Sequence, residues 1–343
     1  MSMEKIRTLR LAHPEPERQK IRLVPVFLPF AGCPGRCVFC DQQLQTGVRP
    51  QASSQVLETL EGRLSREEKP YALGFFGGTF TGLDERSQNL FLNLAARFRA
   101  SGQLQHLRLS TRPDRIDVDT IARLRRDGVD MIEIGVQTFD TDVLRNSGRG
   151  YAGQVAEEAC RMVRAGGLEL GIQLLPGLPG HGEATWREDV GKALRLAPSV
   201  IRIYPCVVMA GTELDRMFIR GEYSPWSLDL AVAETGWAVL RFWEAGIRVI
   251  RLGLASEREM LAKLMAGPWH PAFGSMVRSE ALRLFLQEKL AGRKVSRALL
   301  PRRLQGELWG HGRANAPALE HLGISRDRVA FWPEQDIFLD VEE

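Results

Sequence analysis

The chain has 343 residues, of which 44% are apolar and 26% are charged, a composition typical of a globular protein with a full core. No stretch approaches the ~20 uncharged apolar residues that cross a bilayer, and the N-terminus lacks the apolar segment of a secretion signal. We therefore expect no membrane partner and a cytoplasmic location. The formal charge of +4 is too small to identify a partner by itself.

Six short apolar runs alternate with amphipathic segments over the first two thirds of the chain. Each run is predicted to be a strand buried on both faces, as in parallel sheets. The runs are residues 23–29, 72–76, 106–110, 131–136, 168–175 and 200–205. The helices predicted between them span residues 51–67, 85–100, 117–127, 153–165 and 183–196. Six β-α units in series predict an α/β fold, either an open doubly wound sheet or a partial (β/α)6 barrel of parallel strands.

The pattern changes after about residue 225. A long helix over residues 228–245, a strand over 247–254 and further helices predict a C-terminal α+β extension. Between Pro271 and Arg313 nine Lys and Arg residues stand against three Glu residues. This local excess of positive charge fits either a phosphate-binding surface or an ordinary solvated face.

Polar and glycine residues follow most of the predicted strands. In both arrangements of a parallel sheet, chemistry gathers at the C-terminal ends of the strands. Those ends carry three cysteines, Gly77-Gly78-Thr79, Ser110-Thr111-Arg112-Pro113, Gln137, Pro176-Gly177 and Tyr204-Pro205. The sequence therefore predicts an active site at this edge of the sheet.

Three of the five cysteines, Cys33, Cys37 and Cys40, lie within eight residues directly after the first predicted strand. An odd number spaced in this way is a poor disulfide framework. Three soft thiolates without a fourth nearby suit an iron-sulfur cluster with one open iron. A structural zinc site, which would recruit Cys160, Cys206 or a histidine as a fourth ligand, and unligated thiols are the alternatives.

The spacing Cys33-Pro-Gly-Arg-Cys37-Val-Phe-Cys40 resembles the signature of the radical S-adenosylmethionine superfamily, in which an aromatic residue such as Phe39 usually precedes the last cysteine. The resemblance implies that the three cysteines hold a 4Fe-4S cluster whose open iron binds S-adenosyl-L-methionine. It also implies that the reduced cluster cleaves this cofactor to a 5′-deoxyadenosyl radical, which abstracts a substrate hydrogen. A reductant such as flavodoxin or ferredoxin is the partner that this chemistry needs.

Other motifs resemble cofactor-binding segments of the same superfamily. Gly77-Gly78-Thr79 is similar to the Gly-Gly-Glu segment that binds the amino group of the cofactor, with Thr79 replacing the usual glutamate. This replacement favours backbone contacts. As a simpler alternative, two glycines form a tight strand-to-helix turn.

The segment that ends at Gln137, together with Arg149, resembles part of oxygen-independent coproporphyrinogen oxidase and of the elongator catalytic subunit. The resemblance implies contacts of Gln137 and Arg149 with the adenosine and carboxylate of the cofactor. By the same match Gln173 stands where the porphyrin enzymes often carry an aspartate for the ribose, and Ser110 is a further candidate cofactor contact. A loop hydrogen bond by Gln137 and a surface charge at Arg149 are the alternatives.

The whole run of motifs from about Pro25 to Trp226 resembles the radical domain of the elongator catalytic subunit. Two features depart from that family, because the first gap in the cysteine triplet is shorter and an acetyltransferase domain has no room after residue 255. We expect a related, shorter enzyme that modifies RNA, such as tRNA. The alternatives are the same chemistry on a small molecule such as a porphyrinogen, or an iron-sulfur protein that binds RNA or senses redox state.

We expect an N-terminal extension over residues 1–22, a radical S-adenosylmethionine core over 23–255 and a basic extension over 256–343. Within the basic extension, residues 308–315 resemble the Gly-x-x-Gly loop of a KH RNA-binding module, which would span 295–335. Arg313 takes the place of the second glycine. The resemblance implies RNA as a partner of this region, and an ordinary helix-turn-helix packing element is the alternative.

Overall fold

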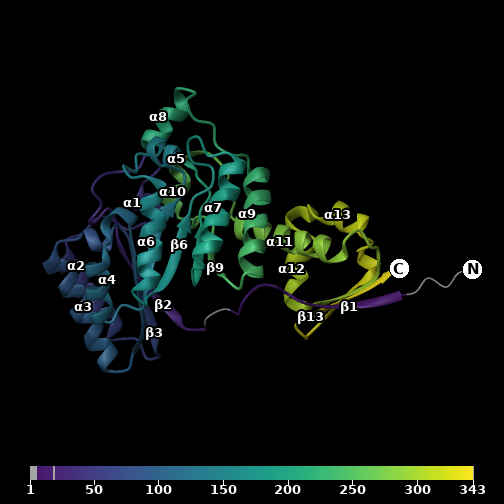
Figure 1. Cartoon of the computed structure of the whole chain (residues 1–343), viewed down its shortest axis with the longest axis horizontal. Coiled ribbons are helices and arrows are strands. Elements are labelled where there is room, and N and C mark those ends of the chain that lie inside the picture. Colours follow the sequence, from purple (N-terminus) through teal and green to yellow (C-terminus); the bar gives the residue numbers. More distant parts are fainter. Residues whose placement is uncertain (1–5, 18–19, 343) are drawn as a thin grey trace, which may run out of the picture. The chain divides into compact units, whose positions relative to one another are not determined.

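The computed structural model describes residues 6–17 and 20–342, which form two compact units (Figure 1). The barrel unit consists of residues 18–227 and 253–269. The mixed-sheet unit consists of residues 1–17, 228–252 and 270–343. The domain boundaries expected from the sequence, 1–22, 23–255 and 256–343, stay a prediction. Within the described residues, no helix is long and apolar enough to cross a membrane.

The barrel unit contains six parallel strands that curl into a partial barrel, so the α/β fold predicted from the sequence is confirmed. The strands are β2 (Arg22–Leu28), β3 (Tyr71–Gly77), β4 (Leu104–Thr111), β5 (Met131–Gln137), β6 (Glu169–Leu174) and β7 (Val200–Ile203). They pair in chain order, and every neighbouring pair runs parallel. All six predicted apolar runs are therefore strands, and their C-terminal ends meet at one edge.

Helices connect these strands along the outside of the sheet (Figure 1). They are α1 (Gln42–Thr46), α2 (Ser53–Leu64), α3 (Glu85–Ala100), α4 (Val118–Arg126), α5 (Thr141–Asn146), α6 (Gly153–Ala165) and α7 (Glu183–Leu196). Two further helices of this unit, α8 (Glu213–Ile219) and α10 (Arg258–Lys263), come after β7. Aspartates 84, 117 and 140 cap α3, α4 and α5, because each carboxylate accepts a hydrogen bond from a backbone N–H of the first turn. The short strands β8 (Val208–Met209) and β10 (Leu264–Ala266) pair antiparallel.

The core of the barrel unit lies between the sheet and these helices. Strand β3 is buried on both faces from Tyr71 to Phe76, as the continuous apolar run predicts. Phe75 packs against Phe91 of α3 with ring centroids 5.2 Å apart. This packing holds the strand ends, and the loops that follow them, in a defined arrangement.

The mixed-sheet unit is built around a four-stranded sheet in the order β1-β13-β11-β12. Its strands are β1 (Ile6–Ala12), β11 (Val295–Pro301), β12 (Val329–Trp332) and β13 (Asp336–Glu342). Its other elements are α9 (Leu228–Glu244), β9 (Arg248–Leu252), α11 (Phe273–Leu290), α12 (Gln305–Leu308) and α13 (Ala316–His321). Residues 308–315 run from the end of α12 through a 3-10 turn at His311–Arg313, and their KH-like role stays a prediction.

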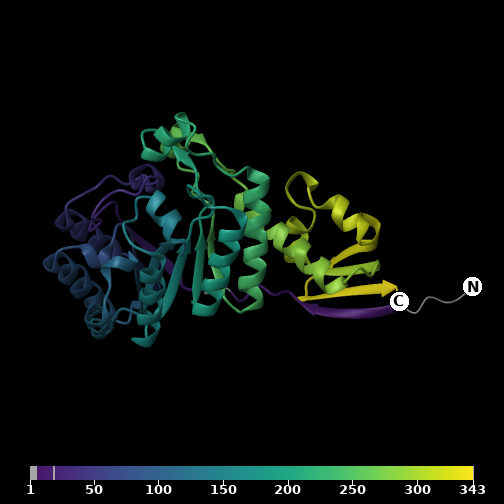
Figure 2. The ribbon, with the colours of Figure 1, turned by 45° about the horizontal axis from the view of Figure 1, so that its top comes forward.

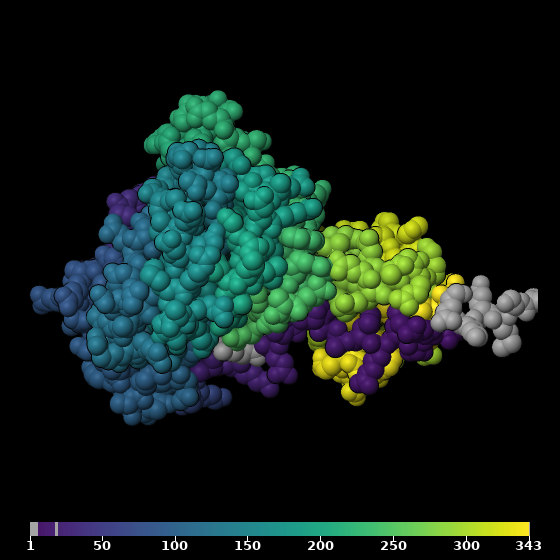
Figure 3. Space-filling model, viewed as in Figure 1, coloured from purple at the N-terminus to yellow at the C-terminus, as the bar shows by residue number. Residues whose placement is uncertain are grey.

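The N-terminal residues belong to this sheet. Strand β1 runs antiparallel to β13, with Ile6 opposite Glu342 and Ala12 opposite Asp336. Figures 2 and 3 show this N-terminal segment in purple beside the C-terminal strand in yellow. The N-terminal strand was not predicted from the sequence.

His13 follows β1 and is half-buried against the rings of Trp243 and Phe285, at centroid distances of 5.3 and 6.3 Å. Its Nδ1 accepts a hydrogen bond from the backbone N–H of Glu15. Burial, with a further contribution from Arg303, lowers the pKa of His13 from 6.5 to about 4. The folded unit therefore holds this imidazole neutral at pH values where an unfolded chain protonates it.

We expect His13 to make the protein less stable as the pH falls from 6.5 to 4, because the unfolded state then binds the extra proton. The loss reaches about 3 kcal/mol, at about 1.4 kcal/mol per pKa unit, and is absent above pH 7. Urea unfolding of His13→Leu at pH 7.5 and pH 5 should show a smaller pH effect than the parent. His321→Leu, which removes an exposed imidazole, is the matched control, and equal pH effects in both variants would contradict the prediction.

Candidate active site

The three clustered cysteines lie in a loop that follows β2. Within it the backbone N–H of Cys33 donates to the carbonyl oxygen of Phe30, and that of Cys40 donates to the carbonyl oxygen of Cys37. The N–H of Thr79, just after β3, donates to the carbonyl oxygen of Ala31 at 2.7 Å. The cysteine loop is therefore bonded to the Gly-Gly-Thr turn of the neighbouring strand.

Glycines allow these two loops to touch backbone to backbone. Gly32 has a φ of +72°, and a Cβ on it would lie 2.2 Å from the carbonyl oxygen of Thr79. A Cβ on Gly78 would lie 2.0 Å from the carbonyl oxygen of Ala31. Gly77 ends β3 with a φ of +100°. The Gly-Gly pair therefore lies against the backbone of the cysteine loop, and its contact with the cofactor stays a prediction.

We expect Gly32→Ala to displace the cysteine loop, because the methyl group would overlap the backbone and the left-handed φ would be strained. The cost is about 1–3 kcal/mol from overpacking and about 1 kcal/mol from the backbone. Gly35→Ala in the same loop is the matched control, because no atom lies within 4 Å of its Cβ position. Gly32→Ala should lower both the free energy of unfolding and the amount of iron bound on reconstitution, and Gly35→Ala should change neither. Equal values for the two variants would argue against this packing.

The thiols of the loop lie in a half-buried setting that disfavours free thiolates. The Sγ of Cys33 lies 3.2 Å from the hydroxyl oxygen of Thr79. Burial raises the pKa of Cys33, and burial together with the charges of Cys37 and Cys33 raises the pKa of Cys40 to about 12. The three thiols are thus close enough to affect one another, and deprotonating all of them calls for a positively charged group.

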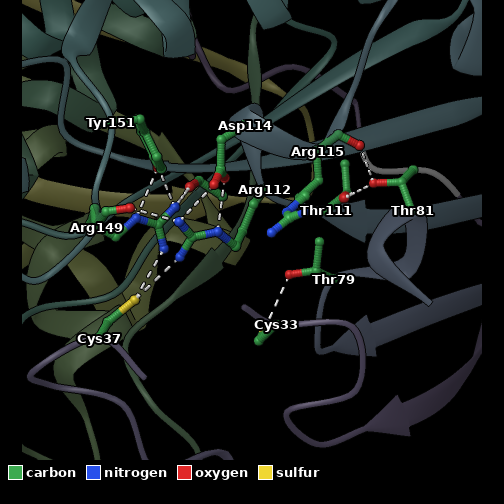
Figure 4. Close-up of polar contacts among 11 residues, drawn as sticks. Cys33, Cys37, Thr79, Thr81, Thr111, Arg112, Asp114, Arg115, Arg149 and Tyr151 are labelled. Atoms are coloured by element: carbon green, nitrogen blue, oxygen red, sulfur yellow. Dashed lines mark hydrogen bonds and ion pairs between the residues drawn. The ribbon is translucent and has the colours of Figure 1, made fainter. Parts of the chain in front are cut away.

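Two arginines point at the sulfur of Cys37 (Figure 4). The Nη1 atom of Arg149 donates to Sγ at 3.5 Å, and the Nη1 atom of Arg112 does so at 3.8 Å. Burial lowers the pKa of Arg149, but Tyr151 and Cys37 outweigh it, so this pKa lies above its ordinary value. Arg149 is therefore a buried cation at the cysteine loop, and the alternative that it is only a surface charge does not hold.

Both guanidinium groups also make hydrogen bonds to groups other than Cys37, and these bonds fix their orientation. Arg149 donates to the carbonyl oxygen of Gly135 on β5 and to the hydroxyl of Tyr151. Arg112 donates to both carboxylate oxygens of Asp114, at 2.8 and 3.0 Å, and to the carbonyl oxygen of Arg149 at 2.7 Å. From the sequence, Arg112 was named only as part of the motif at the end of a strand, with no contact assigned to it, and Tyr151 was not named.

The other expected cofactor contacts lie at the same edge of the sheet or beside it. The side-chain N–H of Gln173 on β6 donates to the side-chain oxygen of Gln137 at 3.2 Å, so both amides are brought together. Gln137 ends β5 with a φ of +70°, a conformation that costs free energy for any residue but glycine. Ser110 is half-buried on β4, and Phe39 packs against an apolar cluster that includes Leu175 and Leu214.

A carboxylate with two arginines lies on the strands of the sheet, and its Glu133 stands opposite Ser110 in the register. Glu133 of β5 lies 3.3 Å from Nε of Arg108 on β4 and 2.8 Å from Nε of Arg202 on β7. The side chain of Glu133 is 4% exposed. Both guanidinium groups lie over the ring of Phe76, at 5.4 and 4.4 Å from its centroid. Four strands therefore meet through one carboxylate and one aromatic ring.

Three thiols and two arginines are the groups that a cluster in this loop would contact. A 4Fe-4S cluster places its thiolates on separate irons, so its ligands stand further apart than those of zinc. The three thiols lie close enough to affect one another's pKa, and two arginine side chains contact the sulfur of Cys37. This arrangement fits a negatively charged cluster with thiolate ligands.

Comparison with known proteins defines the class. The model of the Radical SAM superfamily matches residues 27–193, and that of the Radical_SAM C-terminal domain matches residues 198–283. The chain belongs to the radical SAM superfamily and is a radical SAM enzyme, whose cofactors are a 4Fe-4S cluster and S-adenosyl-L-methionine. The first of these matches includes all three clustered cysteines.

Particular relatives come from two groups. A "tRNA uridine(34) acetyltransferase" of Methanocaldococcus infernus is 25% identical, over 67% of this chain and 52% of the relative. The "Heme chaperone HemW" of Bacillus subtilis is 24% identical, over 57% of this chain and 53% of the relative. The solved structure of the Methanocaldococcus infernus Elp3 is similar in fold, with a TM-score of 0.57 and 21% identity over 81% of this chain and 67% of that one. The chain spans about half the length of the first two relatives.

Proposed function

We propose that the protein cleaves S-adenosylmethionine reductively and abstracts a hydrogen atom from a nucleoside of RNA. One observation carries the proposal: the cysteine loop after β2 meets Thr79 after β3 and Arg112 and Arg149 after β4 and β5. Cys33, Cys37 and Cys40 would hold the cluster. The bound cofactor supplies the radical, and the protein orients it and excludes water.

The surrounding side chains have matching roles in this proposal. The backbone of Gly77 and Gly78 approaches the cofactor's amino group, and Arg149 supplies a buried positive charge for its carboxylate. The paired amides of Gln137 and Gln173, with Ser110, offer hydrogen bonds to the adenosine. Flavodoxin or ferredoxin would supply the electron, and the protein would meet either donor in the cytoplasm.

RNA is the substrate class that the relatives and the charge favour. The relatives include proteins named for tRNA uridine(34), although acetyl transfer is not proposed for this chain. In the basic region Arg278 and Arg283 are paired with glutamates. Arg297, Arg302 and Arg313 are exposed and are the candidates for contacts with phosphate.

A porphyrin-related substrate is the second candidate. It is supported by relatives named "Heme chaperone HemW" and "Oxygen-independent coproporphyrinogen-III oxidase-like protein HemZ". The chemistry at the cysteine loop would be the same, and only the molecule that donates the hydrogen would differ.

The test is anaerobic reconstitution with iron and sulfide, followed by dithionite and S-adenosylmethionine, with chromatography of 5′-deoxyadenosine. Bulk tRNA, the same tRNA after nuclease digestion, and a porphyrinogen are added in parallel. Stimulation by intact tRNA alone supports the proposal, and stimulation by the porphyrinogen alone supports the second candidate. A protein that holds the cluster and forms no 5′-deoxyadenosine in any arm would refute the radical chemistry.

RNA binding is tested separately by the salt dependence of tRNA affinity. We expect a steep fall of affinity with salt, because lysine and arginine contacts release counterions from phosphate. Arg302→Glu with Arg313→Glu should weaken binding and flatten this dependence. Arg126→Glu, an exposed arginine on α4, is the matched control. Equal affinity in all variants would exclude the basic region as the RNA surface.

A further inference from the structure

Arg112 has no part in the proposed cofactor contacts, yet it is among the most constrained side chains at the site. The residue is 7% exposed. Its Nε and Nη2 atoms are occupied by Asp114 and by the carbonyl oxygen of Arg149. Nη1 is thereby aimed at the Sγ atom of Cys37, as Figure 4 shows.

We propose that Arg112 is a positioning residue that donates a hydrogen bond to the sulfur of Cys37 and raises the reduction potential of the cluster held there. This inference rests on the proposed function, because it needs Cys37 to be a cluster ligand. Hydrogen bonds to the ligating sulfurs and the local charge are among the factors that set such potentials.

The sign follows from charge. One electron from a reductant such as dithionite converts the oxidised 2+ cluster to the 1+ state, so reduction adds one negative charge. A fixed cation at a ligating sulfur stabilises the more negative state more strongly, and the potential rises. The counter-charge of Asp114 is nearer to solvent, since its side chain is 25% exposed and that of Arg112 is 9% exposed. Solvent screens the carboxylate more, which leaves a net positive effect at Cys37.

Two arginines at one sulfur are not redundant in this arrangement. Arg149 is tied to β5 through Gly135, and Arg112 is tied to its own turn through Asp114. Arg112 also holds the backbone of Arg149, so it orders the second donor. A lysine would keep the charge but lacks the planar fork that makes these bonds together.

The experiment compares the cluster midpoint potential, by dye-mediated titration followed by electron paramagnetic resonance, in the reconstituted full-length chain without substrate. Arg112→Gln should make reduction about tenfold less favourable, which is ~59 mV lower for one electron. Arg112→Lys should recover part of this shift. Arg115→Gln, an exposed arginine in the same turn, is the matched control and should leave the potential unchanged.

Asp114→Asn should shift the midpoint potential upward, opposite to Arg112→Gln, because it removes a negative charge and keeps the shape of the side chain. If Arg112→Gln does not retain a cluster, the test is the potential of Asp114→Asn. A midpoint potential of Asp114→Asn that is equal to or lower than that of the parent overturns the inference. Equal potentials in the parent and Arg112→Gln, or equal shifts in Arg112→Gln and Arg115→Gln, would also overturn it. Failure of the parent protein to hold a cluster on the three cysteines would instead overturn the proposed function.

Discussion

Cys37→Ala is expected to abolish formation of 5′-deoxyadenosine and to remove the absorbance of the reconstituted cluster. A 4Fe-4S cluster with one open iron needs all three thiols of the loop, and Cys160 is buried in α6. Loss of the Sγ atom also leaves Arg149 buried without its sulfur partner. Both the ligand and the charge balance of the site are lost together.

The matched control is Cys160→Ala, which removes a thiol that is fully buried in α6. That variant should keep its cluster and its turnover, and should lose only the modest stability of a small buried side chain. Iron and sulfide content, absorbance and 5′-deoxyadenosine are measured for both proteins after identical reconstitution. A Cys37→Ala protein that still binds the cluster and still forms 5′-deoxyadenosine would show that Cys37 is not a cluster ligand.

Glu133→Gln is expected to lower the free energy of unfolding by about 3–5 kcal/mol, because it removes the buried carboxylate that faces Arg108 and Arg202, whose side chains are only 12% and 14% exposed. The cost is large because water reaches little of either guanidinium group and screens the two charges poorly. Urea unfolding at neutral pH measures it. The substitution preserves the size of the side chain, so a cavity does not contribute to the result.

Glu213→Gln is the matched control, because Glu213 also contacts two arginines, Arg216 and Arg220, but at the surface. Its removal should have little effect, since exposed ion pairs are screened by solvent. Similar losses in the two variants would show that burial does not set the strength of the Glu133 cluster. A double-mutant cycle between Glu133 and Arg202 would then separate their interaction from general effects of the substitutions.

Local patterns were sufficient for most of the barrel unit. The apolar runs that become β2 to β7 are short and continuous, and helices such as α3 and α6 begin and end at the residues that their periodicity indicates. Because the C-terminal ends of parallel strands share one edge, the order of the motifs also predicted that the cysteine loop and the Gly-Gly-Thr turn would lie together. A resemblance in the cysteine spacing then predicted the superfamily that the comparisons confirm.

The sequence by itself thus determined the strand and helix pattern, the edge that carries the site and the class of chemistry, because each depends on neighbouring residues. Only the tertiary structure decided which distant groups meet. The pairing of β1 with β13 joins residues more than 300 positions apart, and no local pattern encodes such a partner. Arg112, which follows β4, and Arg149, which follows α5, likewise meet at Cys37 only in the folded chain. The same holds for Glu133 and the two arginines that share its carboxylate, which come from three different strands.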